Sequence, residues 1–266
     1  MALHRPHMPE TPAPAAAHVH TNRQTRSLSL STSLVQSCMR LDAPDDLVLD
    51  YTRTMMGALL LHPEPRHILM VGLGGGSMVK YLYRHVPEAH LTVVEISQEV
   101  IDLRQEFLIP HDDERLSTVC DDGARFMAHP PRRYDLILVD GFTGDGIAEA
   151  LCSARFYRHC RQALSTTGLL AANVQADTEP TRQIVQRLTK VFDGAVISVT
   201  SDEGGNDIVT AGPRALFEQC RSDFEGHWSR LHPTHQATLA VASTRIERAL
   251  KRGFGSAPSG AAISAT

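Results

Sequence analysis

Short apolar runs alternate with amphipathic stretches along most of this chain. The apolar runs predict strands at residues 68–72, 91–95, 116–120, 134–139, 168–174, 194–200 and 206–211. Apolar positions at helical spacing predict helices near residues 76–85, 97–107, 123–129, 153–163 and 178–191. Because strands and helices alternate at short intervals, we expect a mostly parallel sheet with helices on both faces.

The last two predicted strands follow each other directly, and the residues between them, Glu203 to Asn206, predict a hairpin. One strand of that pair must therefore run antiparallel to the rest. This pattern places the chain in the α/β class. It predicts a Rossmann-like seven-stranded sheet of the kind found in methyltransferases, preceded by a short N-terminal β segment.

The two ends of the chain differ from this pattern. Residues 1–25 have no apolar periodicity and predict a disordered tail, and residues 26–44 alternate apolar and polar positions and predict a short β segment. Asp45 is expected to cap a helix that ends before Pro63, at the start of an α/β domain covering residues 45–251. Beyond residue 213, apolar positions predict a helix packed on the sheet, and residues 252–266 predict a second disordered tail.

A glycine-rich turn follows the first strand of the predicted sheet. Gly72, Gly74 and Gly76 allow the backbone to pass close to a ligand that a Cβ atom would push away. Glu95 ends the next strand, where a carboxylate accepts hydrogen bonds from a ribose diol. The dinucleotide pattern G-x-G-x-x-G would need glycine at position 77, which is Ser77 here. The G-x-G-x-G spacing is more typical of S-adenosylmethionine sites, so we expect a nucleoside ligand of that kind.

Composition excludes several other classes of function. The net charge of −4 provides no large cationic field for a nucleic acid. The longest apolar run, residues 55–61, is too short to span a bilayer, and the N-terminus lacks the apolar core of a secretory signal. The five cysteines show no C-x-x-C spacing and predict reduced thiols. We therefore expect a cytoplasmic protein with no nucleic-acid or membrane partner and no metal.

Acidic residues end three successive predicted strands. They are Glu95, the pair Asp121-Asp122, and Asp140. Ligands of open α/β sheets bind at this edge, although a single acid after a strand is more often a helix cap. Clustered carboxylates repel one another, and adenosine, a sulfonium or an amine would each relieve that cost.

Four segments with these features resemble the polyamine aminopropyltransferases (spermidine synthases). They are residues 68–76, 93–101, 121–126 and 134–140, and the similarity continues through residues 148–151 and 155–157. The resemblance implies a transferase of polyamine biosynthesis that moves an aminopropyl group from decarboxylated S-adenosylmethionine to a small amine acceptor. A homodimer is a further possibility.

The resemblance also implies roles for individual residues. Glu95 would hold the ribose, Asp122 with Gly123 the adenine end, and the glycine loop the methionine-derived chain. Asp140 matches the first aspartate of the family's D-S-S-D loop and would help to deprotonate the attacking amine. An amine must lose a proton before it can displace a thioether, so a nearby base is required.

The chain departs from the family on the acceptor side. Thr143 stands where the second aspartate of that loop is expected, and a hydroxyl does not supply the charge that pairs with an ammonium. Asp145 is a candidate substitute, and Gln36 is a loose match to a glutamine near the amine site. Three alternatives therefore stay open: an S-adenosylmethionine-dependent methyltransferase, a degenerate homologue that binds nucleosides or protein partners, and, more remotely, a nicotinamide oxidoreductase.

Overall fold

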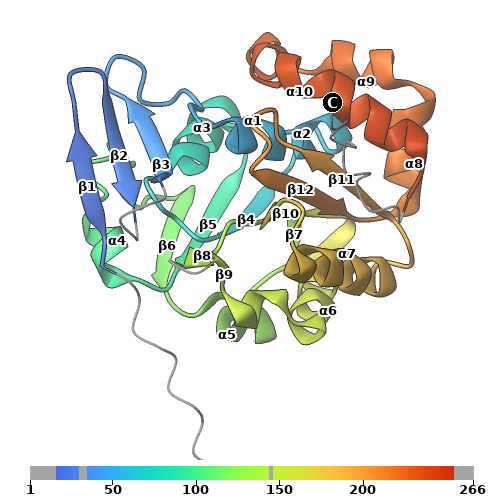
Figure 1. The fold of residues 1–266 in the computed structure, drawn as a ribbon, viewed down its shortest axis with the longest axis horizontal. Coiled ribbons are helices and arrows are strands. Elements are labelled where there is room, and N and C mark those ends of the chain that lie inside the picture. The colour runs from blue at the N-terminus through green and yellow to red at the C-terminus, as the bar shows by residue number, and fades with distance from the viewer. Residues whose placement is uncertain (1–15, 30–34, 144–145, 255–266) are drawn as a thin grey trace, which may run out of the picture.

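A seven-stranded sheet forms the centre of the molecule (Figure 1). The computed structural model describes residues 16–29, 35–143 and 146–254. The strand order is β11-β12-β10-β7-β4-β5-β6. The strands are β4 (His67–Val71), β5 (His90–Glu95), β6 (Leu116–Cys120), β7 (Tyr134–Val139), β10 (Leu164–Gln175), β11 (Val196–Thr200) and β12 (Asn206–Ala211). β12 pairs antiparallel with both of its neighbours, and the other pairings are parallel. The predicted fold class and the terminal hairpin are therefore confirmed.

Helices cover both faces of this sheet, and each face has its own apolar core. On one face pack α1 (Asp50–Met55), α2 (Ala58–Leu61), α3 (Ser77–His85), α8 (Arg214–Ser222), α9 (Phe224–Arg230) and α10 (Pro233–Arg252). On the other pack α5 (Gly123–Ala128), the 3-10 helix η1 (Glu149–Cys152), α6 (Ala154–Ala163) and α7 (Glu179–Val191), while α4 (Gln98–Asp102) follows β5. Along β7, Leu136 and Leu138 enter the first core, whereas Ile137 and Val139 enter the second. This alternation explains why the central strands are apolar throughout.

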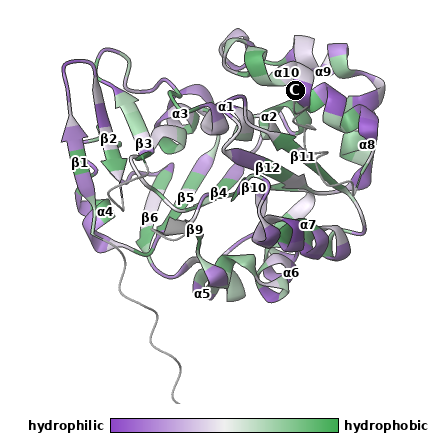
Figure 2. Ribbon diagram, viewed as in Figure 1, coloured by the Kyte–Doolittle hydropathy of each residue, from purple (hydrophilic) through white to green (hydrophobic). Residues whose placement is uncertain are grey.

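A small antiparallel sheet precedes the main one and includes part of the N-terminal segment that was predicted to be disordered. It consists of β1 (His18–Thr21), β2 (Thr25–Ser29) and β3 (Val35–Arg40), so the expected disorder is wrong for residues 18–25. Asn22 closes the first turn, since its side-chain oxygen accepts from the backbone N–H groups of Gln24 (2.8 Å) and Thr25 (2.7 Å). β1 is mostly hydrophilic (Figure 2), so its residues lack the apolar alternation that predicts a strand. Residues 1–15 and 255–266 lie outside the described residues, so disorder there stays a prediction.

The helix expected from Asp45 is also corrected. It begins at Asp50, and Gly57 separates α1 from α2. A Cβ atom at Gly57 would lie 2.7 Å from the Ile246 side chain, so the glycine allows α10 to approach closely. Asp45 instead forms an ion pair with Arg84 at 2.5 Å. Where the helix begins and breaks therefore depends on its packing against α10, which is about 190 residues further along the chain.

Two other predicted helices differ in extent from the helices observed. The helix expected near residues 97–107 is regular only over α4, Gln98–Asp102. The single helix expected after residue 213 is two helices, α8 and α9, because Asp223 ends α8 and caps α9 by accepting from the N–H of Gly226 at 3.0 Å. α10, which is 20 residues long, was not predicted. No helix in the described part of the chain is long and apolar enough to cross a membrane.

Candidate active site

The glycine loop leaves β4 in a conformation that only glycine adopts readily. Gly72, Gly74 and Gly76 have φ values of 98°, 52° and 65°. A Cβ atom at Gly72 would collide with the carbonyl oxygen of Asp140, and one at Gly76 would collide with Ile109. The loop therefore passes directly beside the end of β7, which brings the predicted nucleoside loop and the predicted base together.

Glu95 anchors this loop from the end of β5. The residue is 8% exposed, and its two carboxylate oxygens accept from the backbone N–H groups of Leu73 (2.8 Å) and Ser97 (2.9 Å). A carboxylate oxygen has two lone-pair directions, so each oxygen retains one for a further donor. The geometry makes Glu95 a structural anchor, and it leaves room for the predicted ribose contact, which stays a prediction.

Asp122 caps a helix. Its Oδ1 atom accepts from the N–H groups of Ala124 (2.7 Å) and Arg125 (3.0 Å) at the start of α5. Gly123 is required there, since a Cβ atom would collide with Val71 of β4. The preceding Asp121 forms an ion pair with Arg125. The predicted contacts of Asp122 and Gly123 with the adenine end stay predictions, because both observed roles are structural.

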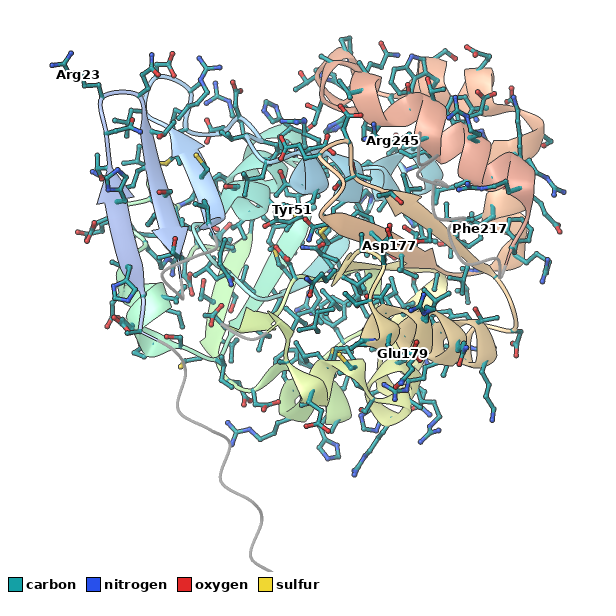
Figure 3. All side chains as sticks on the ribbon, viewed as in Figure 1. Arg23, Tyr51, Asp177, Glu179, Phe217 and Arg245 are labelled. Atoms are coloured by element: carbon teal, nitrogen blue, oxygen red, sulfur yellow. The ribbon has the colours of Figure 1, made fainter. Side chains whose placement is uncertain are left out.

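Asp140 lies at the centre of a polar cluster built from distant segments. Its Oδ2 atom is 3.2 Å from the hydroxyl of Tyr51 on α1, and its Oδ1 atom accepts from Nδ2 of Asn173 on β10 at 2.8 Å. Asn173 in turn accepts from Nδ2 of Asn206 on β12 at 2.9 Å. The hydroxyl of Tyr51 also lies 3.1 Å from the carbonyl oxygen of Gln36 on β3. Figure 3 shows Tyr51 near the middle of the molecule, beside the sheet.

The environment of Asp140 favours its protonated form. Desolvation raises the pKa of this carboxyl above its usual range, although the hydrogen bonds from Asn173 and Tyr51 act in the opposite direction. The negative charge of Glu95 adds to the increase. Burial likewise raises the pKa of Tyr51 well above 10. A carboxyl with a raised pKa holds a transferred proton more readily, as a base that accepts a proton from an ammonium must.

The remaining predicted substrate residues are only partly described. Gln36 reaches the cluster through its backbone carbonyl. Thr143 lies in β8 (Phe142–Thr143), whose backbone pairs with that of β9 (Gly146–Ile147), and its side chain is outside the description. Asp145 lies outside the described residues. The roles expected for these three residues in amine binding stay predictions.

Sequence reasoning did not assign a role to Tyr51, Asn173 or Asn206. Asn173 carried a usable signal, because it is 3% exposed and interrupts the apolar run of β10 at the ligand-binding edge of the sheet. Asn206 lies at the start of β12 and carried no such signal, since its partner is a side chain 33 residues away. No group of three His, Cys, Asp or Glu side chains suited to a metal ion occurs among the residues that the structure covers.

These features define an α/β protein whose glycine loop and strand-end carboxylates lie together at the carboxyl edge of the sheet. A family model described as the spermine/spermidine synthase domain matches residues 49–201. The polyamine aminopropyltransferase of Neisseria meningitidis is 39% identical over 196 residues, which cover 73% of this chain and 74% of that protein. The polyamine aminopropyltransferase of Chromobacterium violaceum is 38% identical over 187 residues, or 70% and 72% of the two chains. The chain therefore belongs to the spermine/spermidine synthase family, and the predicted resemblance is confirmed.

Solved structures show the same fold. A probable spermidine synthase from Corynebacterium glutamicum superposes with a TM-score of 0.65 at 22% identity and covers 74% of this chain and 76% of its own. Human methyltransferase-like protein 13, in complex with SAH, superposes with a TM-score of 0.53 at 19% identity, over 81% of this chain and 94% of its own. At these identities the likeness concerns the fold alone, which both classes share.

Proposed function

We propose that this protein transfers an aminopropyl group from decarboxylated S-adenosylmethionine to a small amine. The observation that carries the proposal is the cluster around Asp140, which lies directly beside the glycine loop. Its oxygen atoms suit an amine, which donates hydrogen bonds and carries positive charge when protonated.

The chain's own residues account for the chemical steps that such a transfer needs. Asp140 accepts a proton from the acceptor ammonium, and the neutral nitrogen then attacks the carbon attached to the sulfonium. The new C–N bond forms as the C–S bond breaks, and the thioether leaves with both electrons of that bond. Tyr51 and Asn173 hold the Asp140 carboxyl in place from α1 and β10.

The charges at this edge of the sheet support the decarboxylated donor. Glu95 ends β5 and Asp122 caps α5 at this edge, and their carboxylates disfavour a ligand that brings its own carboxylate. The second candidate is an S-adenosylmethionine-dependent methyltransferase, which Thr143 in place of the expected aspartate favours. A homodimer and a cytoplasmic location stay predictions.

Calorimetry with both donors tests the proposal. Decarboxylated S-adenosylmethionine and S-adenosylmethionine are titrated separately into the full chain, each with and without putrescine. Tighter binding of the decarboxylated donor, increased by the diamine, is the expected result. Preference for S-adenosylmethionine with no response to amines would establish the methyltransferase alternative, and binding of neither would indicate a degenerate homologue.

A further inference from the structure

A groove is lined by residues of α6 and α7. These two helices pack on the face of the sheet that also carries α5 (Figure 1). The groove has a volume of about 560 Å³, and four of its lining residues are cationic. These four are Arg158, Arg161, Arg187 and Lys190. We call the groove that these four residues line the basic groove. None of the four belongs to the cluster around Asp140.

The positive charge of the basic groove is largely uncompensated. α6 contains three arginines and no acid, and the only acid of α7, Glu179 (Figure 3), forms an ion pair with Arg182 at 3.0 Å. Of the four groove cations, Arg161 alone has a carboxylate partner among the described residues, Asp193 at 2.7 Å. Three like charges therefore surround one groove in a chain whose net charge is −4. Their mutual repulsion costs stability unless an anion occupies the groove.

Two of the guanidinium groups are already held in position. Arg187 donates to the carbonyl oxygen of Cys152 at 2.7 Å and to the side-chain oxygen of Gln183 at 3.2 Å. Arg161 donates to the carbonyl oxygen of Val191. These bonds hold both guanidinium groups in place, so the two side chains lose little freedom when an anion binds. Arg187, whose acceptors are neutral, also keeps its full charge.

The rest of the lining defines what kind of anion fits. Besides the cations it contains Gln162 and two small apolar side chains, Ala154 and Val191, and no aromatic ring. A nucleobase would find no stacking surface there, whereas phosphate oxygens match the arginine forks. We propose that the basic groove binds a compact multivalent anion of the pyrophosphate or short-polyphosphate class.

Titration of pyrophosphate into the full chain, followed by calorimetry at constant ionic strength, tests this proposal. We expect saturable binding at one site per chain. The double variant Arg158→Gln/Lys190→Gln should weaken it at least about tenfold, because each exposed side chain supplies a charge-assisted contact. Arg155→Gln is the matched control, since Arg155 is an exposed arginine of the same helix outside the groove lining, and it should leave the affinity within about twofold.

Three results would overturn the proposal. The first is the absence of saturable binding to the wild-type chain. The second is an equal loss of affinity in Arg155→Gln, which would indicate nonspecific attraction. The third is competition by S-adenosylmethionine or its thioether product, which would place the anion at the glycine loop. Thermal melting of each variant confirms that the fold is intact.

Discussion

The two sides of the proposed site, one for the donor and one for the acceptor, are built in opposite ways. The donor side, from Val71 to Ser97, is one continuous β-α-β segment, and backbone N–H groups of that same segment hold its Glu95 carboxylate. The acceptor side gathers Gln36, Tyr51, Asp140, Asn173 and Asn206 from five separate elements or their ends. The first depends on local chain geometry, and the second depends on the whole fold being in place.

This difference sets how each side responds to change. On the donor side, backbone conformation decides the geometry, so loss of a glycine damages the site more than loss of a side-chain contact. On the acceptor side, desolvation and side-chain hydrogen bonds together set the protonation state of Asp140, so conservative substitutions alter the chemistry while the fold survives. Variants of single residues separate these two expectations.

Gly72→Ala should have the largest effect, because it damages both sides together. Its positive φ costs an alanine about 1–2 kcal/mol, and the added Cβ meets the carbonyl oxygen of Asp140. We expect a loss of at least about 3 kcal/mol of unfolding free energy in chemical denaturation. Gly204→Ala is the control, since Gly204 has φ 81° and a Cβ atom added there would meet nothing within 4 Å. Equal losses in the two variants would show that the contact between loop and strand end is not tight.

Asp140→Asn should abolish most turnover and leave the fold intact. Loss of the base is expected to lower kcat at least about a hundredfold, or about 2.7 kcal/mol in the barrier. Asparagine can still accept from Asn173 and donate to the Tyr51 hydroxyl, so the cluster stays connected. Unchanged turnover in steady-state assays would discard the assignment of Asp140 as the base.

The same variant yields a pH test of stability. Because the folded state raises the pKa of Asp140, its carboxyl contributes stability that is complete below the unfolded value near 3.8. That contribution is lost as the pH rises through the folded pKa. Asn does not titrate, so the melting temperature of Asp140→Asn should rise relative to that of the wild type as the pH increases from about pH 4. A constant difference across this range would contradict the raised pKa.

Glu95→Gln should weaken the donor side alone. One of the two backbone N–H groups, of Leu73 or Ser97, loses its acceptor because an amide nitrogen cannot accept, at a cost of about 1–2 kcal/mol. The nucleoside should then bind at least about tenfold more weakly, seen as a smaller ligand-induced rise in melting temperature. If that rise is the same as in the wild type, Glu95 has no role in ribose binding.

Tyr51→Phe should have a smaller effect, confined to the acceptor side. The Tyr51 hydroxyl lowers the pKa of Asp140, so its removal should move the acidic limb of the pH–rate profile to higher pH and reduce kcat about tenfold at neutral pH. Nucleoside affinity should not change. If the acidic limb does not shift, the Tyr51 hydroxyl has no effect on the pKa of Asp140.

Asp122 offers the mildest test. Asp122→Ala removes the cap of α5 and should cost about 1 kcal/mol of stability, whereas Asp122→Asn keeps a capping oxygen. If Asp122 also contacts the adenine end, Asp122→Asn will weaken nucleoside binding without the loss of stability. Equal nucleoside affinity in Asp122→Asn and the wild type would limit Asp122 to its capping role.

In two places where the predictions were wrong, a partner segment decided the structure. The helix expected from Asp45 begins at Asp50, whose buried carboxylate lies 3.5 Å from Arg245 of α10 and also accepts from the N–H of Asp202. β1 exists because it pairs with β2 over four residue pairs, although its own residues are mostly polar. Neither partner can be recognised from the local pattern.

By itself the sequence determined the order of strands and helices in the main sheet, the glycine loop and the acids that end its strands. These features depend on the period of apolar residues and on the freedom of glycine, which act over a few neighbouring residues. The tertiary structure alone decided that Tyr51, Asn173 and Asn206 converge on Asp140, and that desolvation there raises its pKa. The physical reason is that a carboxyl responds to the groups packed around it in space, and here those groups come from parts of the chain up to 89 residues away from Asp140.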